Sequence, residues 1–286
     1  MKVFSKIYIA LVFLILYIPI LVLILFSFNT TSNTGAFSGF SLYWYKELFH
    51  SPATFEALKN TLILAVSAAV ISTVIGTAAA VGIAKMKNKV FRSFVTSITN
   101  IPMMNPEIVT GISMMLLFVA VGTFVGSEKD KVNFGTLLIA HVTFCLPYVI
   151  LSVLPRVRSM DKSIPEAAMD LGCTPVQSFF KVELPMIMPG VITGMIMAFT
   201  LSLDDFIISY FTSGNSFQTL PLLIYSMTKK EVKPDIYALS TLMIIAITIL
   251  LLLSNFSGDR EERLRKRREK RAADAKKRAE EKEGTV

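Results

Sequence analysis

Long apolar stretches alternate with short polar connections along the whole chain. A hydrocarbon core of about 30 Å is crossed by about 20 helical residues, and six stretches are long enough. They are approximately Ile7–Phe26, Thr61–Ala84, Phe94–Ala120, Thr136–Leu154, Ile187–Tyr210 and Ile236–Phe256. We interpret the first as a retained span, because it is too long for a typical signal peptide and lacks a small-x-small cleavage site. The pattern predicts an all-α membrane protein with six transmembrane helices.

Composition agrees with this class and sets the end of the chain apart. Of the 286 residues, 53% are hydrophobic and 17% are charged, against about 25% charged in soluble domains. Residues 257–286 alone hold 12 of the 29 Lys and Arg and 8 of the 21 Asp and Glu. We therefore expect a six-span membrane domain over residues 1–256 and a basic, charged tail over 257–286. Two cysteines exclude a disulfide scaffold.

Basic residues indicate the orientation in the membrane. Cytoplasmic segments of membrane proteins carry an excess of Lys and Arg. The N-terminus, the second and fourth connections and the tail together hold 22 of these residues, and the other three connections hold 7. Both termini are therefore expected in the cytoplasm. The tail is expected to be solvated and to bind no nucleic acid.

The connections leave no room for a separate catalytic domain. No Gly is followed by Lys, so the chain has no phosphate-binding loop of the G-x-x-x-x-G-K-[ST] type. The two histidines, His50 and His141, are far apart and form no metal-ligand pattern. We expect neither an enzymatic nor a metal site. Work against a gradient would need another subunit or a coupled ion.

The connection over about residues 156–186 has the pattern of two short helices joined at a glycine. Ser163 and Glu166 form a possible capping box, and Gly172 stands where a helix end favours positive φ. Thr174 and Gln177 form a second box, and Leu184-Pro185 is expected to end the second helix. The segment is either an amphipathic connector on the membrane surface or a rigid docking element for a cytoplasmic partner.

Several strings resemble one family of membrane proteins. The run Glu166–Gly172, followed by Leu184-Pro185, resembles the EAA loop of ABC-importer permeases. Other strings resemble the permeases of spermidine/putrescine importers, and the resemblance extends from about Tyr17 to Phe256. They are Asn105–Val109, His141–Pro147, Leu201–Asp205 and Leu220–Met227. Within the first, Glu107 stands where that family has Asp.

The resemblance implies the type I ABC importer (MetI-like) fold and a set of partners. These are a homologous second permease, an ABC ATPase dimer that uses ATP and Mg, an extracytoplasmic polyamine-binding protein and membrane lipid. The chain itself would bind no cofactor and would lie as a multi-pass protein in the bacterial cytoplasmic (inner) membrane. The ATPase-coupling loop would comprise Glu166, Ala167, Ala168, Asp170, Gly172, Leu184 and Pro185.

Apart from His141, only three ionisable side chains fall well inside the predicted spans, and all are acids: Glu107, Asp204 and Asp205. Charges at membrane depth usually face a cavity, a partner or a pathway. Pro102 and Pro106 predict a kink or break near Asn105–Glu107. Asp204 and Asp205 differ by about 100° around a helix, so at most one faces a pore unless the helix is unwound there.

Two interpretations of these acids remain open: a cation pathway, or polar contacts that hold helices together. For His141, a satisfied contact between helices is favoured over a pathway role. The whole pattern predicts the permease subunit of an ATP-driven polyamine (spermidine/putrescine) importer. The alternatives are a permease for another solute, an ion-coupled cation carrier or channel, and a structural membrane anchor.

Overall fold

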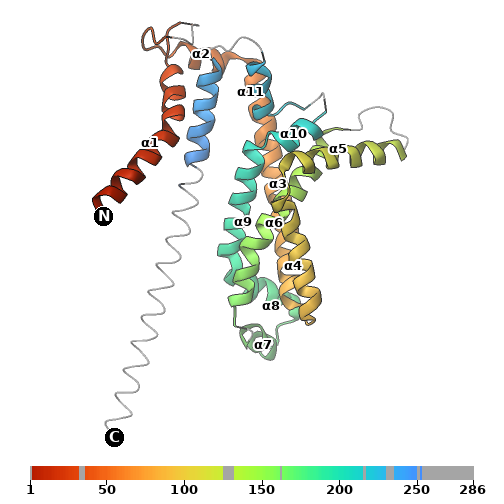
Figure 1. Cartoon of the computed structure of the whole chain (residues 1–286). Coiled ribbons are helices and arrows are strands. Elements are labelled where there is room, and N and C mark those ends of the chain that lie inside the picture. The colour runs from red at the N-terminus through yellow and green to blue at the C-terminus, as the bar shows by residue number, and fades with distance from the viewer. Residues whose placement is uncertain are drawn as a thin grey trace. The chain divides into compact units, whose positions relative to one another are not determined.

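In the part of the chain that the structure describes, almost every residue is helical (Figure 1). This computed structural model describes residues 2–31, 36–124, 132–161, 163–214, 217–229, 235–249 and 252. The isolated β-bridge between Asn29 and Phe40 lies between the first two helices. The tail over residues 257–286 lies outside the described residues, so the predicted domain boundary there stays a prediction.

The helices follow the apolar pattern of the sequence. Their bounds are α1 Lys2–Phe26, α2 Tyr43–His50, α3 Pro52–Lys85, α4 Lys89–Met104, α5 Glu107–Phe124, α6 Phe134–Ser159, α7 Ser163–Asp170, α8 Pro175–Ser178, the π-helical turn Phe179–Glu183, α9 Leu184–Asp204, α10 Ile207–Thr212, α11 Leu220–Thr228 and a further helix Asp235–Ile249.

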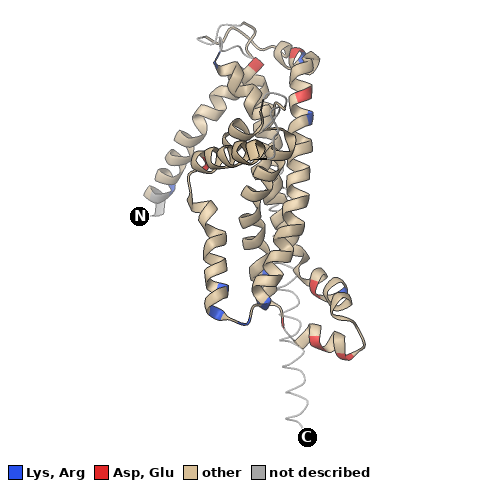
Figure 2. Ribbon diagram, turned by 90° about the vertical axis from the view of Figure 1, so that its right-hand side faces the viewer, with Lys and Arg blue, Asp and Glu red and all other residues tan. Residues whose placement is uncertain are grey.

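Five helical stretches are long and apolar enough to cross a membrane. They are Lys6–Phe26, Pro52–Lys85, Glu107–Phe124, Phe134–Ser159 and Pro175–Asp204. The shorter apolar helix Asp235–Ile249 covers much of the sixth predicted span, and the end of that span lies outside the described residues. Charged residues gather mainly at helix ends and in connections (Figure 2). An all-α, multi-pass membrane fold is therefore confirmed, while the count of six spans and the side of each terminus stay predictions.

The third predicted span is divided in two. Helix α4 ends at Met104 and α5 begins at Glu107, so the predicted break near Asn105–Glu107 is confirmed. Pro106 has no N–H to continue the helix, and its carbonyl instead accepts hydrogen bonds from the N–H groups of Val109 and Thr110. A new helix therefore starts with Glu107 in its first turn.

The chain forms two compact units, each built from separate stretches of sequence. Among the described residues, the first unit lies within Met1–Ala68, Pro102–Phe144 and Phe199–Ile247, and the second lies mainly within Ala69–Ile101 and Cys145–Ala198. Long helices such as α3 contribute residues to both units. The acidic residues singled out above belong to the first unit, and the predicted coupling loop belongs to the second.

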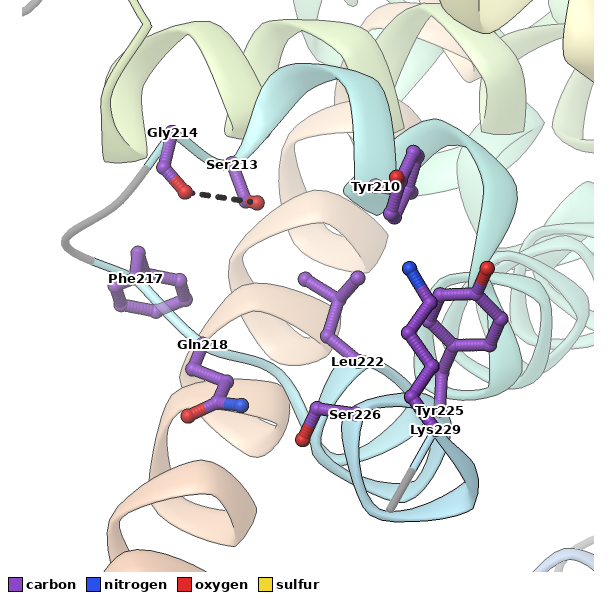
Figure 3. Close-up of a pocket in the computed structure, with 9 residues that line it drawn as sticks. All are labelled: Tyr210, Ser213, Gly214, Phe217, Gln218, Leu222, Tyr225, Ser226 and Lys229. Carbon is purple, nitrogen blue, oxygen red and sulfur yellow. Dashed lines mark hydrogen bonds between the residues drawn. The ribbon is translucent and has the colours of Figure 1, made fainter.

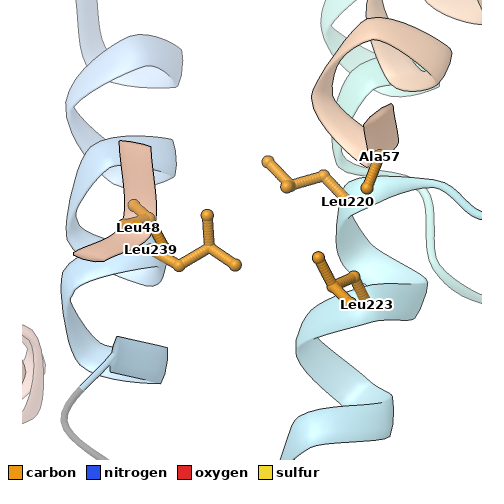
Figure 4. Close-up of a cluster of buried hydrophobic side chains, with 5 residues drawn as sticks. All are labelled: Leu48, Ala57, Leu220, Leu223 and Leu239. Carbon is orange, nitrogen blue, oxygen red and sulfur yellow. The ribbon is translucent and has the colours of Figure 1, made fainter. Parts of the chain in front are cut away.

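A small apolar cluster joins helices of the first unit. It contains Leu48, Ala57, Leu220, Leu223 and Leu239 from four helices (Figure 4). Beside it, the Thr61 hydroxyl accepts the Leu220 N–H at 2.7 Å and donates to the Ala57 carbonyl at 2.8 Å. This buried hydroxyl therefore fixes the start of α11 against α3.

Glycines allow close helix approach in the second unit. A Cβ placed on Gly76 of α3 would lie 2.7 Å from a methyl carbon of Val149 in α6. A Cβ on Gly190 of α9 would lie 2.8 Å from the Ser152 carbonyl oxygen, which belongs to the backbone and has little freedom to move. These positions need glycine because of the neighbouring helix.

We expect Gly190→Ala to lower the stability of the assembled protein. Forcing an extra carbon into a packed contact costs about 1–3 kcal/mol. The matched control is Gly82→Ala, because a Cβ there meets nothing within 4 Å and alanine favours the helix. Thermal unfolding in detergent should give a lower Tm for Gly190→Ala and an unchanged or higher Tm for Gly82→Ala. Equal Tm values for Gly190→Ala and wild type would contradict the packing argument.

Candidate functional site

The fifth predicted span, Ile187–Tyr210, is not one continuous helix. Helix α9 ends at Asp204, and α10 begins at Ile207 after two non-helical residues. The Asp205 carboxylate accepts the N–H of Ser209 at 2.8 Å and the N–H of Ile208 at 3.3 Å. A carboxylate that accepts hydrogen bonds from these N–H groups helps to start a new helix. It replaces the backbone hydrogen bonds that are lost at the break. Asp205 thus caps α10.

The buried side chain of His141 reaches this break from α6. Its Nδ1 lies 2.8 Å from the Ser202 hydroxyl, and its Nε2 lies 3.0 Å from the Ser209 hydroxyl. The same Nε2 lies 3.4 Å from Asp205 Oδ2, and both side chains are almost fully buried. The predicted role of His141 as a satisfied polar contact between helices is confirmed.

The break separates the two neighbouring aspartates. Asp205 is buried and hydrogen-bonded, whereas Asp204 is exposed. Glu107, at the start of α5, is also exposed. Helix α5 lies beside α10, as Figure 1 shows. Of the three acids predicted for a pathway, two are therefore exposed, Glu107 on the helix beside α10 and Asp204 just before α10, and Asp205 is buried.

Three aromatic rings lie at the break or after it. Phe206 contacts both Tyr210 and Tyr225, with ring centroids 5.6 and 4.6 Å apart. The Lys229 ammonium lies over the Tyr225 ring, 4.7 Å from its centroid. This is the geometry of a cation–π contact.

Tyr210 and Tyr225 border a cavity of about 440 Å³ (Figure 3). It is lined by Tyr210, Ser213, Gly214, Phe217, Gln218, Leu222, Tyr225, Ser226 and Lys229. Neither Tyr225 nor Lys229 was named as a site residue from the sequence. Their spacing of four residues, which places both on one face of a helix, was the signal available.

The predicted glycine elbow is present in the coupling loop. Gly172 has φ +92° and joins α7 to α8. Thr174 and Gln177 form the expected capping box, with the Thr174 Oγ1 accepting the Gln177 N–H at 3.3 Å. The Ser178 hydroxyl donates to the Pro165 carbonyl at 3.2 Å and fastens the second helix to the first. The loop is a closed helical hairpin.

Two local predictions for this loop are wrong. Ser163 does not cap α7 but lies in its first turn, and its N–H donates to Asp161 Oδ1 at 3.0 Å. That hydrogen bond lowers the pKa of the Asp161 carboxyl. Leu184-Pro185 does not end the second helix, because the π-helical turn leads directly into α9. The wider turn accommodates Pro185, which would clash with the carbonyl four residues earlier in a regular helix.

The hairpin presents exposed apolar side chains. Leu171 is 88% exposed, Val176 65% and Phe180 60%. Among the predicted coupling residues, some are exposed and two are partly buried. Glu166, Ala167, Asp170, Gly172 and Pro185 are exposed, and Ala168 and Leu184 are partly buried. Exposed apolar side chains on a rigid hairpin favour a docking element over a simple connector.

An ion pair missed by the sequence reading fixes the end of this hairpin. Lys85, the last residue of α3, lies 2.8 Å from Oε1 of Glu183. The Glu183 side chain is only 6% exposed, and its second oxygen has no hydrogen-bond partner. The two residues are 98 positions apart in the sequence, so no local pattern predicts that they pair.

Known proteins resemble this chain over most of its length. Residues 72–268 match the family described as binding-protein-dependent transport system inner membrane component. The putrescine transport system permease protein PotI of Escherichia coli is 41% identical over 91% of this chain and 92% of its own. The spermidine/putrescine transport system permease protein PotC of Haemophilus influenzae is 38% identical over 85% and 91%.

Solved structures share the fold at low sequence identity. A bacterial ABC transporter involved in the import of the acidic polysaccharide alginate gives a TM-score of 0.69 at 15% identity, covering 92% of this chain and 95% of that one. The MetNI methionine ABC transporter gives 0.51 at 18% identity, covering 73% and 96%. Because these transporters carry different solutes, the fold alone does not select one. The family match and the identity to its members together show that this chain belongs to the inner-membrane components of binding-protein-dependent transport systems.

Proposed function

We propose that this chain is a permease subunit of an ATP-driven importer for polyamines such as spermidine and putrescine. The relatives named above are permeases of putrescine and of spermidine/putrescine transport systems, and their similarity covers most of this chain. The chain's own contribution would be half of the translocation pathway. It has no enzymatic role in this proposal, and a partner supplies ATP hydrolysis.

The observation that carries the proposal is the exposed acid pair at two helix breaks. Glu107 begins a helix after one break, and Asp204 ends a helix before the other. A polyamine carries several ammonium groups, and removing them from water costs free energy unless each meets an opposite charge. Two carboxylates on adjacent elements offer those charges at membrane depth.

The aromatic cavity supports the same class of substrate. The Lys229 ammonium on the Tyr225 ring is an alkylammonium group like those of a polyamine. A ring that accepts this group has the electron-rich face that a cationic substrate needs, at about 0.5–2 kcal/mol per contact. We therefore include Tyr225, with Tyr210 and Phe206, in the proposed pathway.

The coupling hairpin would receive an ABC ATPase subunit. Its exposed apolar side chains would dock into the ATPase, which uses ATP and Mg, and a homologous second permease would complete the pathway. A polyamine-binding protein outside the membrane would deliver the substrate. ATP binding would close the ATPase pair and move the hairpins, and hydrolysis would reset the spans.

Co-purification tests this assignment against a carrier or an anchor. We expect the tagged chain to retain a nucleotide-hydrolysing subunit, and Leu171→Asp to release that subunit while the permease stays in the membrane. The matched control is Thr174→Ser on the same hairpin, because it keeps the capping hydroxyl and should retain the subunit. Substrate uptake by the purified chain alone, with no ATPase bound, would contradict the proposal.

A further inference from the structure

The ring of His141 joins the two sides of the α9–α10 break. One ring nitrogen lies 2.8 Å from Ser202, in the last turn of α9. The other lies 3.0 Å from Ser209, in α10. His141 therefore contacts one hydroxyl before the break and one after it, and it reaches both from a third helix, α6.

These contacts favour the broken form over a continuous helix. A break at membrane depth is tolerated only where its freed backbone groups find new partners. Asp205 accepts two N–H groups of α10, and His141 lies 3.4 Å from the same carboxylate. All of these side chains are buried, where an unsatisfied polar group is costly. A continuous helix would pair its own backbone and would disrupt this arrangement.

The break determines where Asp204 points. In a continuous helix Asp204 and Asp205 would differ by about 100° around the axis. In the broken form Asp205 is buried and Asp204 is exposed. Next to it, α10 lies close against α5, since a Cβ on Gly111 would be 2.9 Å from the Phe211 ring. Helix α5 begins with Glu107, so α10, which follows the break, packs against the helix that carries the second exposed acid.

We propose that His141 is a positioning residue that clamps the two sides of this break and thereby holds Asp204 toward the aqueous side. His141 does not contact the transported cation. The inference rests on the proposed role of Asp204 in the pathway. In this inference, one buried cluster sets the orientation of the Asp204 side chain. The cluster consists of His141, Ser202, Asp205 and Ser209.

Thiol labelling of the assembled complex tests the clamp without measuring transport. The two cysteines of the sequence, Cys145 and Cys173, are replaced by alanine, and Asp204→Cys supplies a single thiol. Its reaction rate with a cationic methanethiosulfonate is compared with that of Leu203→Cys, whose native side chain is buried. With His141 present, we expect the thiol of Asp204→Cys to react at least tenfold faster than that of Leu203→Cys.

Removing the clamp should reduce this difference. His141→Leu is expected to slow labelling of the Asp204→Cys thiol about tenfold and to bring its rate close to that of Leu203→Cys. Ser202→Ala and Ser209→Ala each remove one contact and should give intermediate rates. They also carry the test if His141→Leu fails to assemble. The matched control is His50→Leu, because His50 is exposed and its Nδ1 lies 2.7 Å from the carbonyl oxygen of Lys46 in its own helix.

The outcomes separate the clamp from the proposed function. Labelling of Asp204→Cys that stays fast in assembled His141→Leu, or in the double variant Ser202→Ala/Ser209→Ala, would overturn the clamp. An Asp204→Cys thiol that does not react with His141 present would also overturn it. If labelling responds to His141 but the wild-type complex transports no polyamine, the clamp stands and the polyamine assignment falls.

Discussion

Replacing Asp204 with Asn lowers polyamine uptake by the assembled importer about 10- to 100-fold. A hydrogen bond to a charged group contributes about 1.5–3 kcal/mol, and each 1.4 kcal/mol corresponds to a factor of ten. Asn keeps the size of Asp204 but loses the charge that would balance an ammonium group. Initial rates of labelled spermidine uptake, at equal amounts of complex in the membrane, measure the effect.

Two controls separate the charge of Asp204 from its packing. Asp204→Glu keeps the charge and should retain a larger part of the uptake than Asn. Glu56→Gln neutralises an exposed acid near the start of α3, outside the two breaks, and should leave uptake unchanged. Equal uptake by wild type and Asp204→Asn would remove Asp204 from the pathway and would favour a purely structural role for the intramembrane acids.

Reversing either charge of the Lys85–Glu183 ion pair should uncouple ATP hydrolysis from uptake. Removing one partner of a fully buried pair costs about 3–5 kcal/mol. The cost is smaller here, because the Lys85 side chain is 57% exposed. Lys85→Glu would place a second acid beside the buried Glu183 and push the coupling hairpin away from α3. We expect at least a tenfold loss of uptake per ATP hydrolysed.

The exchange variant Lys85→Glu/Glu183→Lys makes this prediction specific. It restores an ion pair with the charges in opposite places and should recover part of the lost uptake per ATP. Lys89→Glu, at the start of α4, controls for net charge near the membrane. If the exchange variant shows no more uptake per ATP hydrolysed than the single variants, a direct coupling role for the pair is contradicted.

The sequence predicted the features that depend on local pattern. Apolar stretches of about 20 residues located most of the helices, because burial in hydrocarbon demands such runs. Pro106 located the break before Glu107, and the order Thr174, Pro175, Gln177 located the cap of α8. Each of these signals lies within a few residues of the structure that it determines.

Features that depend on distant residues were missed or incompletely predicted. No proline or glycine in the sequence indicates the break after Asp204. The break is instead stabilised by a buried carboxylate and by a histidine from another helix. The sequence raised the possibility of unwinding there but could not decide which aspartate turns inward. The pairing of Lys85 with Glu183 likewise depends on helix packing across 98 positions.

Labelled spermidine and putrescine uptake most directly tests the central claim of polyamine import. The measurement uses cells that lack their own polyamine importer and carry this chain with its ATPase, second permease and binding protein. We predict saturable uptake that requires this chain, stops on energy depletion and is blocked by excess unlabelled polyamine. A complex that assembles and hydrolyses ATP, yet takes up neither polyamine, would contradict the assignment.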